Sequence, residues 1–335
     1  MREYIDCIDA GTEYCPCHLA ESNECILCSQ LHGSKFCDCL NWNGVCIYHE
    51  FISNNSRAKE GRKTYTCKVV KKEIYEENLL LIKFEVPHKL AVDLSKAGSY
   101  VFIRTNENIY FDVPISIMKS NVETDIITIM IEIRGIKTKK LLEIEEEGEI
   151  TIRAPYWNGV FGIRNLNKQF NNNVLVIAKG IGAAPMIPIV RKLFLNKNKI
   201  NLMLDKAPYK ENHVKDYLKE YDHNLIEESI LNRGELTEEA KALIKKFVKN
   251  EGVKYIHTSG ADILTVKVIE FLDEIEAKDV TLSCCNNTKM CCGEGICGSC
   301  TVRFAGRRVK RLCKLQTDPR NVFEGRRLIW LRLLL

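Results

Sequence analysis

The pattern of hydrophobic and polar positions divides the middle of this 335-residue chain into two parts. In residues 64–165, short runs alternate between apolar and polar positions, as in Ile127–Ile133, with turn signals between them. Such spacing with little helix predicts a small antiparallel barrel. We expect strands at Thr64–Lys71, Leu79–Val86, Tyr100–Thr105, Ile115–Met118, Asp125–Ile133 and Glu149–Ala154, with a short helix at Lys137–Glu145.

From residue 172 to 282, apolar runs alternate with runs of helical period. The buried strand Val174–Ala178 leads through the glycine turn Lys179–Pro185 into a helical pattern, Met186–Leu195. We expect further strands at Ile200–Leu204, Leu225–Ser229 and Lys254–Thr258. Helices are expected between and after them, at Glu211–Tyr221, Glu238–Asn250 and Leu264–Ala277. This alternation predicts a doubly wound parallel sheet that binds its ligand at the carboxyl edge.

The glycine turn has the form G-x-G-x-x-P. A strand, a glycine turn and a helix start together form a setting in which backbone amides receive a phosphate. The candidate nucleotide-binding residues are therefore Gly180, Gly182, Ala183 and Pro185. Asp205 ends the next strand, 23 residues after Gly182, about where an acid contacts a ribose hydroxyl and favours NAD over NADP. Lys206 leaves that choice open, and the alternative for Asp205 is a turn residue.

Four cysteines near the end of the chain follow the spacing C-x4-C-x2-C-x12-C. They are Cys292, Cys297, Cys300 and Cys313. This is the spacing of plant-type [2Fe–2S] centres, whose two irons need four thiolates. Gly293, Gly295 and Gly298 allow the backbone to bend around the cluster and to turn N–H groups toward its sulfurs. The alternatives are a zinc site or unligated cysteines, although zinc loops usually use C-x2-C pairs.

Eight of the sixteen cysteines lie before residue 50, in a segment with few aliphatic residues. A segment of this kind cannot form much of a core alone, and bound metal would supply the missing stability. Two four-thiolate zinc sites or one [4Fe–4S] cluster with spare cysteines both fit the spacing. The candidate ligands are Cys7, Cys15, Cys17, Cys25, Cys28, Cys37, Cys39 and Cys46.

Composition excludes some classes of function. The net charge of +5 is mild, and no basic run with interleaved aromatic residues supports nucleic-acid binding. The start of the chain lacks a secretion signal, which predicts a cytoplasmic protein with reduced cysteines. The apolar stretch Leu328–Leu335 is too short to span a bilayer, so we expect it to pack on the body or on a partner.

Together these patterns predict a multidomain chain. We expect a cysteine-rich metal module (1–50), a linker (51–63), a flavin-type barrel (64–165), an NAD(P)-binding α/β domain (172–282), a [2Fe–2S] module (284–318) and a tail (319–335).

The order of barrel, Gly180–Pro185 turn and four-cysteine run resembles the ferredoxin–NADP reductase superfamily, over residues 64 to 318. It is most similar to the electron-transfer subunits of class B dihydroorotate dehydrogenase and related sulfide dehydrogenase subunits. The resemblance implies FAD on the barrel, with an Arg-Pro-x-Ser-type segment matched at Pro114, Ser116 and Ile117 and a glycine–threonine turn matched at Gly135 and Thr138.

Two residues depart from that family pattern. Val113 stands where the arginine is expected, and Asp112 adds a negative charge where the flavin pyrophosphate would bind. A pyrophosphate is commonly bound by a guanidinium group. Arg104 or Arg134 is therefore the candidate replacement.

The leading hypothesis is an electron-transfer subunit that passes electrons between NAD(P)H, FAD and a [2Fe–2S] cluster. Its partner would be a catalytic flavoprotein subunit or a ferredoxin, in a hetero-oligomer. Since the cofactors carry the chemistry, we expect no catalytic acid–base residues. The alternatives are a redox sensor or assembly scaffold with a degenerate flavin site, and a standalone NAD(P)H:ferredoxin reductase.

Overall fold

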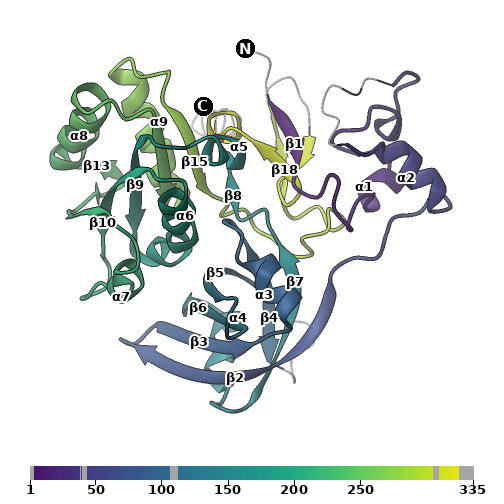
Figure 1. Cartoon of the computed structure of the whole chain (residues 1–335), viewed down its shortest axis with the longest axis horizontal. Helices are drawn as coiled ribbons and strands as arrows, with labels where there is room; N and C mark the ends of the chain where they lie inside the picture. Colours follow the sequence, from purple (N-terminus) through teal and green to yellow (C-terminus); the bar gives the residue numbers. More distant parts are fainter. Residues whose placement is uncertain (1–3, 38, 40–43, 106–111, 305–308, 324–335) are drawn as a thin grey trace. The chain divides into compact units, whose positions relative to one another are not determined.

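In a computed structural model, residues 4–37, 39, 44–105, 112–304 and 309–323 are described (Figure 1). They form two units. The first combines Met1–Lys63 with Thr288–Leu335, and the second is Thr64–Asn287. No helix of the described residues is long and apolar enough to cross a membrane. The apolar stretch Leu328–Leu335 lies outside the described residues.

The second unit begins with a closed six-stranded antiparallel barrel, as the alternating pattern predicts. Its strands follow one another in the order β2 (Lys63–Tyr75), β3 (Leu79–Glu85), β6 (Ile126–Glu132), β5 (Val113–Asn121), β4 (Tyr100–Thr105) and β7 (Glu149–Tyr156). Helix α3 (His88–Leu94), which the pattern does not predict, packs Leu90 and Leu94 into the barrel core. The expected helix Lys137–Glu145 is shorter: α4 (Ile136–Lys140) passes into a 3₁₀ turn at Leu141–Glu143.

Strand β3 shows why apolar and polar residues do not alternate strictly along every barrel strand. Leu80, Ile82 and Phe84 point into the barrel, while Leu79 and Leu81 belong to a second core shared with the neighbouring sheet. A strand that is buried on both faces has no solvent side for polar residues. The barrel and the sheet of this unit are therefore joined by a continuous apolar core.

The sheet has six strands in the order β11, β10, β9, β14, β15 and β8. All pair in parallel except β8, which lies antiparallel at the edge. Their bounds are β8 (Val160–Phe161), β9 (Asn173–Lys179), β10 (Lys199–Asp205), β11 (Asn224–Glu227), β14 (Tyr255–Ser259) and β15 (Thr281–Cys285). The strand order reverses between β9 and β14, and such a switch point is where doubly wound sheets bind ligands.

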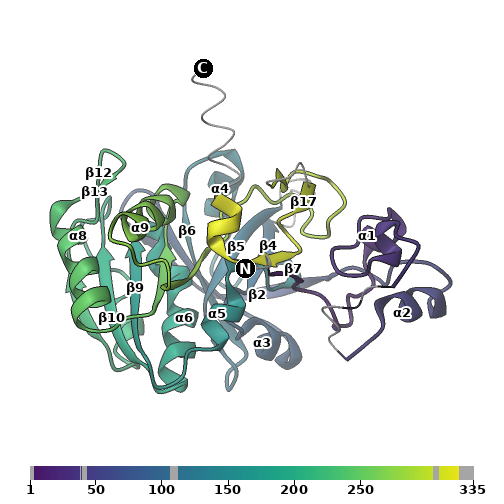
Figure 2. The ribbon, with the colours of Figure 1, turned by 90° about the horizontal axis from the view of Figure 1, so that it is seen from above.

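Helices accompany this sheet (Figure 2). Since right-handed crossovers leave the two central strands in opposite directions, α6 and α9 cover opposite faces. Helix α6 packs between the sheet and the barrel through residues such as Ile187 and Val190. The bounds are α5 (Ile163–Asn167), α6 (Ala183–Leu195), α7 (Lys215–Leu218), α8 (Glu238–Lys245) and α9 (Asp262–Glu274), and a small hairpin joins β12 (Leu231–Asn232) to β13 (Glu235–Leu236).

Two expected helices in this part are too long. The prediction Glu211–Tyr221 shrinks to α7, because the Asn212 side chain accepts a hydrogen bond from the Val214 amide and turns the chain there. The prediction Glu238–Asn250 ends as an α-helix at Lys245 and continues as one π turn.

Over its described residues, the first unit contains only short elements. Strand β1 (Ile5–Cys7) pairs antiparallel with β18 (Leu315–Thr317), and the amide of Ile8 donates to the carbonyl of Lys314 at 2.9 Å. The other elements are α1 (His18–Glu21), a 3₁₀ helix at Gln30–His32, α2 (Ile47–Ser53), β16 (Thr301–Arg303) and β17 (Val309–Arg311). One apolar cluster holds Ala20, Cys28, Leu31 and Phe51, which is a small core for a unit of this length.

Candidate functional site

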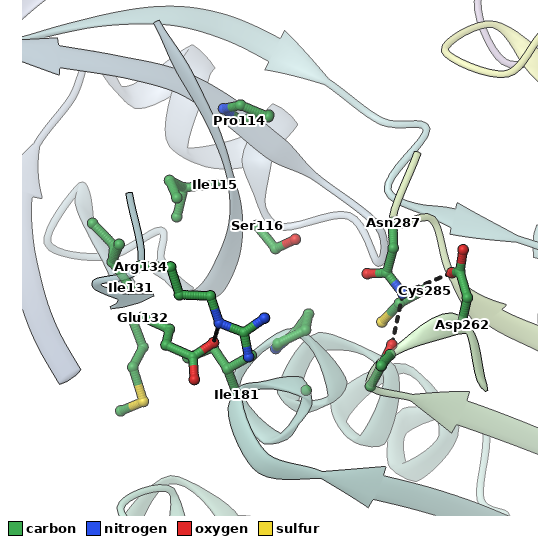
Figure 3. A pocket seen from close by; sticks show the side chains of 15 residues that line it. Pro114, Ile115, Ser116, Ile131, Glu132, Arg134, Ile181, Asp262, Cys285 and Asn287 are labelled. Atoms are coloured by element: carbon green, nitrogen blue, oxygen red, sulfur yellow. Dashed lines mark hydrogen bonds and ion pairs between the residues drawn. The ribbon is translucent and has the colours of Figure 1, made fainter. Parts of the chain in front are cut away.

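A cavity of about 460 Å³ lies between the barrel and the carboxyl edge of the sheet, entirely within the second unit. Figure 3 shows the barrel residues Pro114, Ile115 and Ser116 on one side, with Cys285, Asn287 and Asp262 across from them. Its volume is in the range of cofactor and substrate sites. The complete lining is Pro114, Ile115, Ser116, Met130, Ile131, Glu132, Arg134, Ile181, Gly182, Pro185, Gly260, Ala261, Asp262, Cys285 and Asn287.

The sheet side of the cavity is formed at the switch point. The loops that follow β9 and β14 meet there, because the Ser259 hydroxyl donates to the Gly182 carbonyl at 2.6 Å. A Cβ atom on Gly182 would lie 2.3 Å from the Ser259 carbonyl oxygen, so no larger residue fits without moving the backbone. Gly180 adopts a left-handed conformation, with φ of 56°. Pro185 lies in the first turn of α6, where its missing N–H costs no helical hydrogen bond.

The barrel side contributes residues from β5 and from the end of β6. Pro114 and Ser116 line the cavity, whereas Ile117 is almost completely buried in the barrel core. Arg134 forms an ion pair with Glu132, and Figure 3 shows its guanidinium extending into the space beside Ser116. The structure thus brings four of the predicted residues, Pro114, Ser116, Gly182 and Pro185, to one cavity.

The remaining predicted residues lie elsewhere. Thr138 caps α4, where its hydroxyl oxygen accepts hydrogen bonds from the amides of Arg134 and Gly135. Gly180 and Ala183 border a small neighbouring hollow instead of the main cavity.

Asp205 is buried and fully engaged at the end of β10. Its carboxylate accepts hydrogen bonds from the amides of Ala207 and Ile230, both at 3.0 Å, and pairs with Lys179. These contacts are those of a strand-end turn residue. The role of Asp205 at a ribose stays a prediction.

The sequence interpretation did not select Cys285, Asn287 or Asp262 as site residues. Cys285 ends β15, a strand that the sequence pattern did not predict, and its sulfur lies 3.0 Å from the Ser259 hydroxyl. Burial raises the pKa of this thiol to about 11, so it is protonated at neutral pH. The Asn287 amide donates to Asp262 at 3.1 Å and to the Gly260 carbonyl at 2.6 Å (Figure 3). These residues could have been found from their position at or just after the carboxyl ends of β14 and β15, because doubly wound sheets bind ligands at that edge.

The four carboxy-terminal cysteines come together as two pairs. The Cys297 amide donates to the Cys292 sulfur at 3.5 Å, and the Glu294 amide donates to the same sulfur at 3.3 Å. A hydrogen bond from the Cys313 thiol lowers the pKa of Cys300 to about 6. Burial raises the pKa of Cys297, but hydrogen bonds from Ser299 and Cys292 outweigh burial and lower it to about 7. The surroundings of Cys297 and Cys300 therefore favour the thiolate, the form that ligates metals, whereas the hydrogen bond to Cys300 and burial raise the pKa of Cys313.

No three His, Cys, Asp or Glu side chains within the described ranges surround one point as the ligands of a single metal ion. A [2Fe–2S] centre needs a different arrangement, since each of its irons takes two thiolates. Each of the two cysteine pairs could hold one such iron.

Comparison with known proteins gives the family. No family model matches the chain. Over 207 residues it is 30% identical to the electron transfer subunit of dihydroorotate dehydrogenase B (NAD(+)) from Clostridium acetobutylicum, covering 60% of this chain and 74% of that one. The chain belongs to this family of electron-transfer subunits. A probable member from Methanocaldococcus jannaschii is also 30% identical, over 201 residues, covering 59% of this chain and 70% of that subunit.

Solved structures agree on the fold. An NADH-dependent reduced ferredoxin–NADP oxidoreductase, described in connection with flavin-based electron bifurcation, matches with a TM-score of 0.58 and 18% identity, over 80% of this chain and 98% of that one. A ferredoxin reductase of carbazole 1,9a-dioxygenase matches with a TM-score of 0.50 and 12% identity, over 66% of this chain and 68% of that one. The barrel and sheet therefore have the fold of ferredoxin–NADP reductases, and this electron-transfer subunit is a component of an NAD-linked oxidoreductase.

Within this electron-transfer subunit, the departure at Val113 is accompanied by a cluster of charges. Val113 is buried against the barrel core, and the neighbouring Asp112 is held by Arg104 at 2.8 Å and by Arg153 at 3.1 Å. The Lys137 ammonium donates to the Asp112 carbonyl at 3.2 Å. The negative charge that the sequence places here is thus more than balanced by cations.

Proposed function

We propose that this chain passes electrons between NAD(P)H and a partner oxidoreductase through FAD and a [2Fe–2S] cluster. FAD, NAD and a [2Fe–2S] cluster are the cofactors characteristic of its family. One observation carries the proposal: residues of the flavin-type segment, Pro114 and Ser116, share a single cavity with Gly182 and Pro185 of the nucleotide turn. Flavin and nicotinamide must meet in such a space for a hydride to pass between them.

The residues beside Val113 fit a flavin pyrophosphate. Arg104, Arg153 and Lys137 surround the single carboxylate of Asp112, which leaves two formal positive charges for the two negative charges of a pyrophosphate. The Nε of Arg104 is buried and has no hydrogen-bond partner in the described part of the chain, so it can donate to an added anion. We propose that these three cations replace the missing arginine and that Ser116 faces the flavin ring.

The switch point fits a nicotinamide dinucleotide. The close packing of Gly182 on Ser259 lets the backbone approach a bound pyrophosphate, as glycines do at this position of doubly wound sheets. We propose that the nicotinamide lies toward Cys285 and Asn287, across the cavity from Ser116. A flavin bound here would supply the chemistry that couples hydride transfer from NADH to single-electron transfer.

The carboxy-terminal loop supports the cluster assignment. Cys292 with Cys297 and Cys300 with Cys313 provide two pairs of cysteines, one pair for each iron of a [2Fe–2S] core. The amides of Glu294 and Cys297 point at the Cys292 sulfur, as N–H groups do around cluster ligands.

We further propose that the partner is a catalytic flavoprotein subunit or a ferredoxin, in a hetero-oligomer. None of the sixteen cysteines forms a disulfide, which suits the reducing cytoplasm.

The test is anaerobic purification followed by counts of iron, sulfide and flavin and by absorbance spectra before and after NADH. We expect FAD, iron and sulfide in the protein and bleaching of the flavin by NADH. Iron without flavin, and no response to NADH, would contradict the proposal and leave a cluster-bearing sensor or scaffold. Repeating the reduction with NADPH decides the nucleotide.

A further inference from the structure

Four charged side chains are buried together in the first unit. Asp9 and Arg62 come from the amino-terminal part of this unit, and Glu294 and Lys314 come from its carboxy-terminal part. The side chains of Asp9, Arg62 and Lys314 are each 1% exposed, and that of Glu294 is 12% exposed. We call these four residues the ionic quartet.

Each cation of the quartet contacts both carboxylates. The Arg62 guanidinium donates to Asp9 at 2.5 and 2.9 Å and to Glu294 at 2.9 Å. The Lys314 ammonium donates to Asp9 at 2.5 Å and to Glu294 at 2.9 Å. The backbone amide of Arg62 also donates to Glu294, at 3.2 Å. The two positive and two negative charges balance, and this arrangement is strongly held because an unpaired buried charge is unfavourable.

Two members of the quartet lie next to the proposed cluster ligands along the chain. Glu294 lies between Cys292 and Cys297, and Lys314 directly follows Cys313. The amide of Glu294 donates to the Cys292 sulfur at 3.3 Å, so its backbone contacts a ligand cysteine while its side chain belongs to the quartet. The charges of Glu294 and Lys314 are therefore fixed beside both cysteine pairs.

The amino-terminal part contacts the same loop outside the quartet. Strand β1 pairs with β18, which begins two residues after Cys313. A Cβ on Gly295 would lie 3.0 Å from the side chain of Leu19, so the loop backbone packs directly on that side chain. Arg311 donates to the Gly295 carbonyl at 3.2 Å and pairs with Glu24 at 2.9 Å. The amino-terminal part thus supports the cluster loop, although it lies outside the stretch that resembles the family.

The charges around an iron–sulfur centre affect its reduction potential. Reduction by one electron adds one negative charge to the cluster, so a nearby positive charge favours the reduced form and a nearby negative charge favours the oxidised form. Buried charges act more strongly than exposed ones, because water screens them less. Removing one carboxylate of the quartet should therefore raise the potential, and removing one cation should lower it.

We propose that the ionic quartet positions the loop of the [2Fe–2S] centre and sets its midpoint potential. Asp9 and Arg62 are positioning residues: they hold Glu294 and Lys314, and through them the loop that carries the ligand cysteines. This inference rests on the cluster of the proposed function, but it does not depend on flavin or nucleotide binding in the second unit.

The test is a redox titration of the anaerobically purified chain, with dithionite as the reductant and electron paramagnetic resonance of the reduced cluster as the readout. Glu294→Gln should raise the midpoint potential, and Arg62→Gln should lower it. The matched control is Glu50→Gln, which removes a charge from a partly exposed pair with Lys59 in the same unit and should leave the potential unchanged. Shifts of the same sign in the two quartet variants, or shifts no larger than in the control, would overturn the proposal.

Two more variants separate charge from packing. The double variant Arg62→Gln with Glu294→Gln removes one charge of each sign and leaves the balanced pair of Asp9 and Lys314. Its potential should return close to that of the unmutated chain, whereas a loop that has only lost its packing should deviate further than in either single variant. Arg62→Lys keeps the positive charge and should also keep the potential. A double variant that deviates further than both single variants would overturn the role of the charges.

Hydrogen exchange tests the positioning of the loop without the cluster. In chains freed of iron by a chelator, amide exchange in residues 292–300 should be at least about tenfold faster in Arg62→Gln than in Glu50→Gln, because a broken buried pair loosens its surroundings. Equal exchange would overturn the positioning role, and this measurement decides if a quartet variant does not retain iron. Failure of the proposed function looks different: an unmutated chain that purifies without iron and sulfide would contradict the cluster and leave the exchange result unchanged.

Discussion

At the scale of single residues, the charges around Asp112 matter most for the flavin. Arg104 and Arg153 each donate to one oxygen of its carboxylate, and Lys137 binds its backbone carbonyl. These contacts hold two guanidinium groups and an ammonium next to the position where the family arginine is missing. Cations fixed in advance lose little conformational freedom when an anion binds.

Replacing Arg104 by glutamine should therefore weaken FAD binding. Loss of one charge-assisted hydrogen bond, about 1.5–3 kcal/mol, corresponds to a Kd raised roughly 10- to 100-fold. The measurement is fluorescence titration of flavin-free protein with FAD. Arg233→Gln is the control, since Arg233 lies exposed in the β12–β13 turn. Equal FAD affinity in both variants would show that Arg104 does not bind the pyrophosphate.

Gly182 supports a second prediction at this scale. A methyl group there would lie 2.3 Å from the Ser259 carbonyl oxygen, so Gly182→Ala must push the two loops of the switch point apart. We expect the free energy of unfolding to fall by about 1–3 kcal/mol, as for other overpacked sites. Urea denaturation measures it. Gly135→Ala is the control, because a Cβ there meets nothing within 4 Å at an ordinary φ; similar losses in both variants would contradict the steric argument.

At the scale of elements, the sequence predicts those strands and helices whose hydrophobic residues follow a clear pattern. The strands β4 and β9 and the helix α6 follow long apolar or helical patterns and are found close to their predicted positions. Strand β15 has the sequence Thr-Leu-Ser-Cys-Cys, in which Thr281 is the one β-branched residue and no residue is aromatic, so it carries little of the composition that marks strands. Its conformation is fixed by pairing with β14. Because this strand was not predicted, the sequence also gave no reason to select Cys285 at its end or Asn287 after it as cavity residues.

Four buried charged residues of the first unit, Asp9, Arg62, Glu294 and Lys314, form the ionic quartet, a network of ion pairs. Sequence analysis could not identify this network. Its members are separated by up to 305 positions, and no local pattern marks Arg62, within the expected linker 51–63, as buried. Burial raises the pKa of Asp9, but Lys314 and Arg62 outweigh burial and lower it to about 2. A carboxylate held in this way is charged at neutral pH. Its negative charge balances part of the positive charge of Arg62 and Lys314, which are buried beside it.

Asp9→Asn should accordingly destabilise the first unit. Removing one member of a buried charge network costs roughly 3–5 kcal/mol, because the remaining cations lose half of their balance. Hydrogen exchange of the amides in β1 and β18 measures the effect in that unit. The control is Glu50→Gln, which breaks the partly exposed pair with Lys59 at 3.0 Å and should cost about 1 kcal/mol or less. If exchange speeds up equally in both variants, the quartet contributes no more than a surface pair.

At the scale of the whole molecule, the two units divide the proposed cofactors between them. Every residue that lines the cavity belongs to Thr64–Asn287, whereas all four carboxy-terminal cysteines belong to the other unit. The sequence predicted both groups, since the glycine turn and the cysteine spacing are local patterns. It did not predict that the amino-terminal and carboxy-terminal cysteines share a unit, because this depends on the pairing of β1 with β18.

This division predicts that flavin binding survives loss of the [2Fe–2S] ligands. Cys297 is exposed and belongs to the unit that does not line the cavity, so Cys297→Ser should keep its FAD and its bleaching by NADH. Electron delivery to a one-electron acceptor such as a ferredoxin should fall at least about tenfold, since serine is a poor ligand for the cluster irons. Flavin content, NADH bleaching and acceptor reduction are measured on one preparation, beside the unmutated chain and the control Cys67→Ala, which changes a buried cysteine of the barrel core. Loss of FAD together with the cluster would mean that the units do not bind their cofactors independently, while full acceptor reduction would remove the cluster from the electron path.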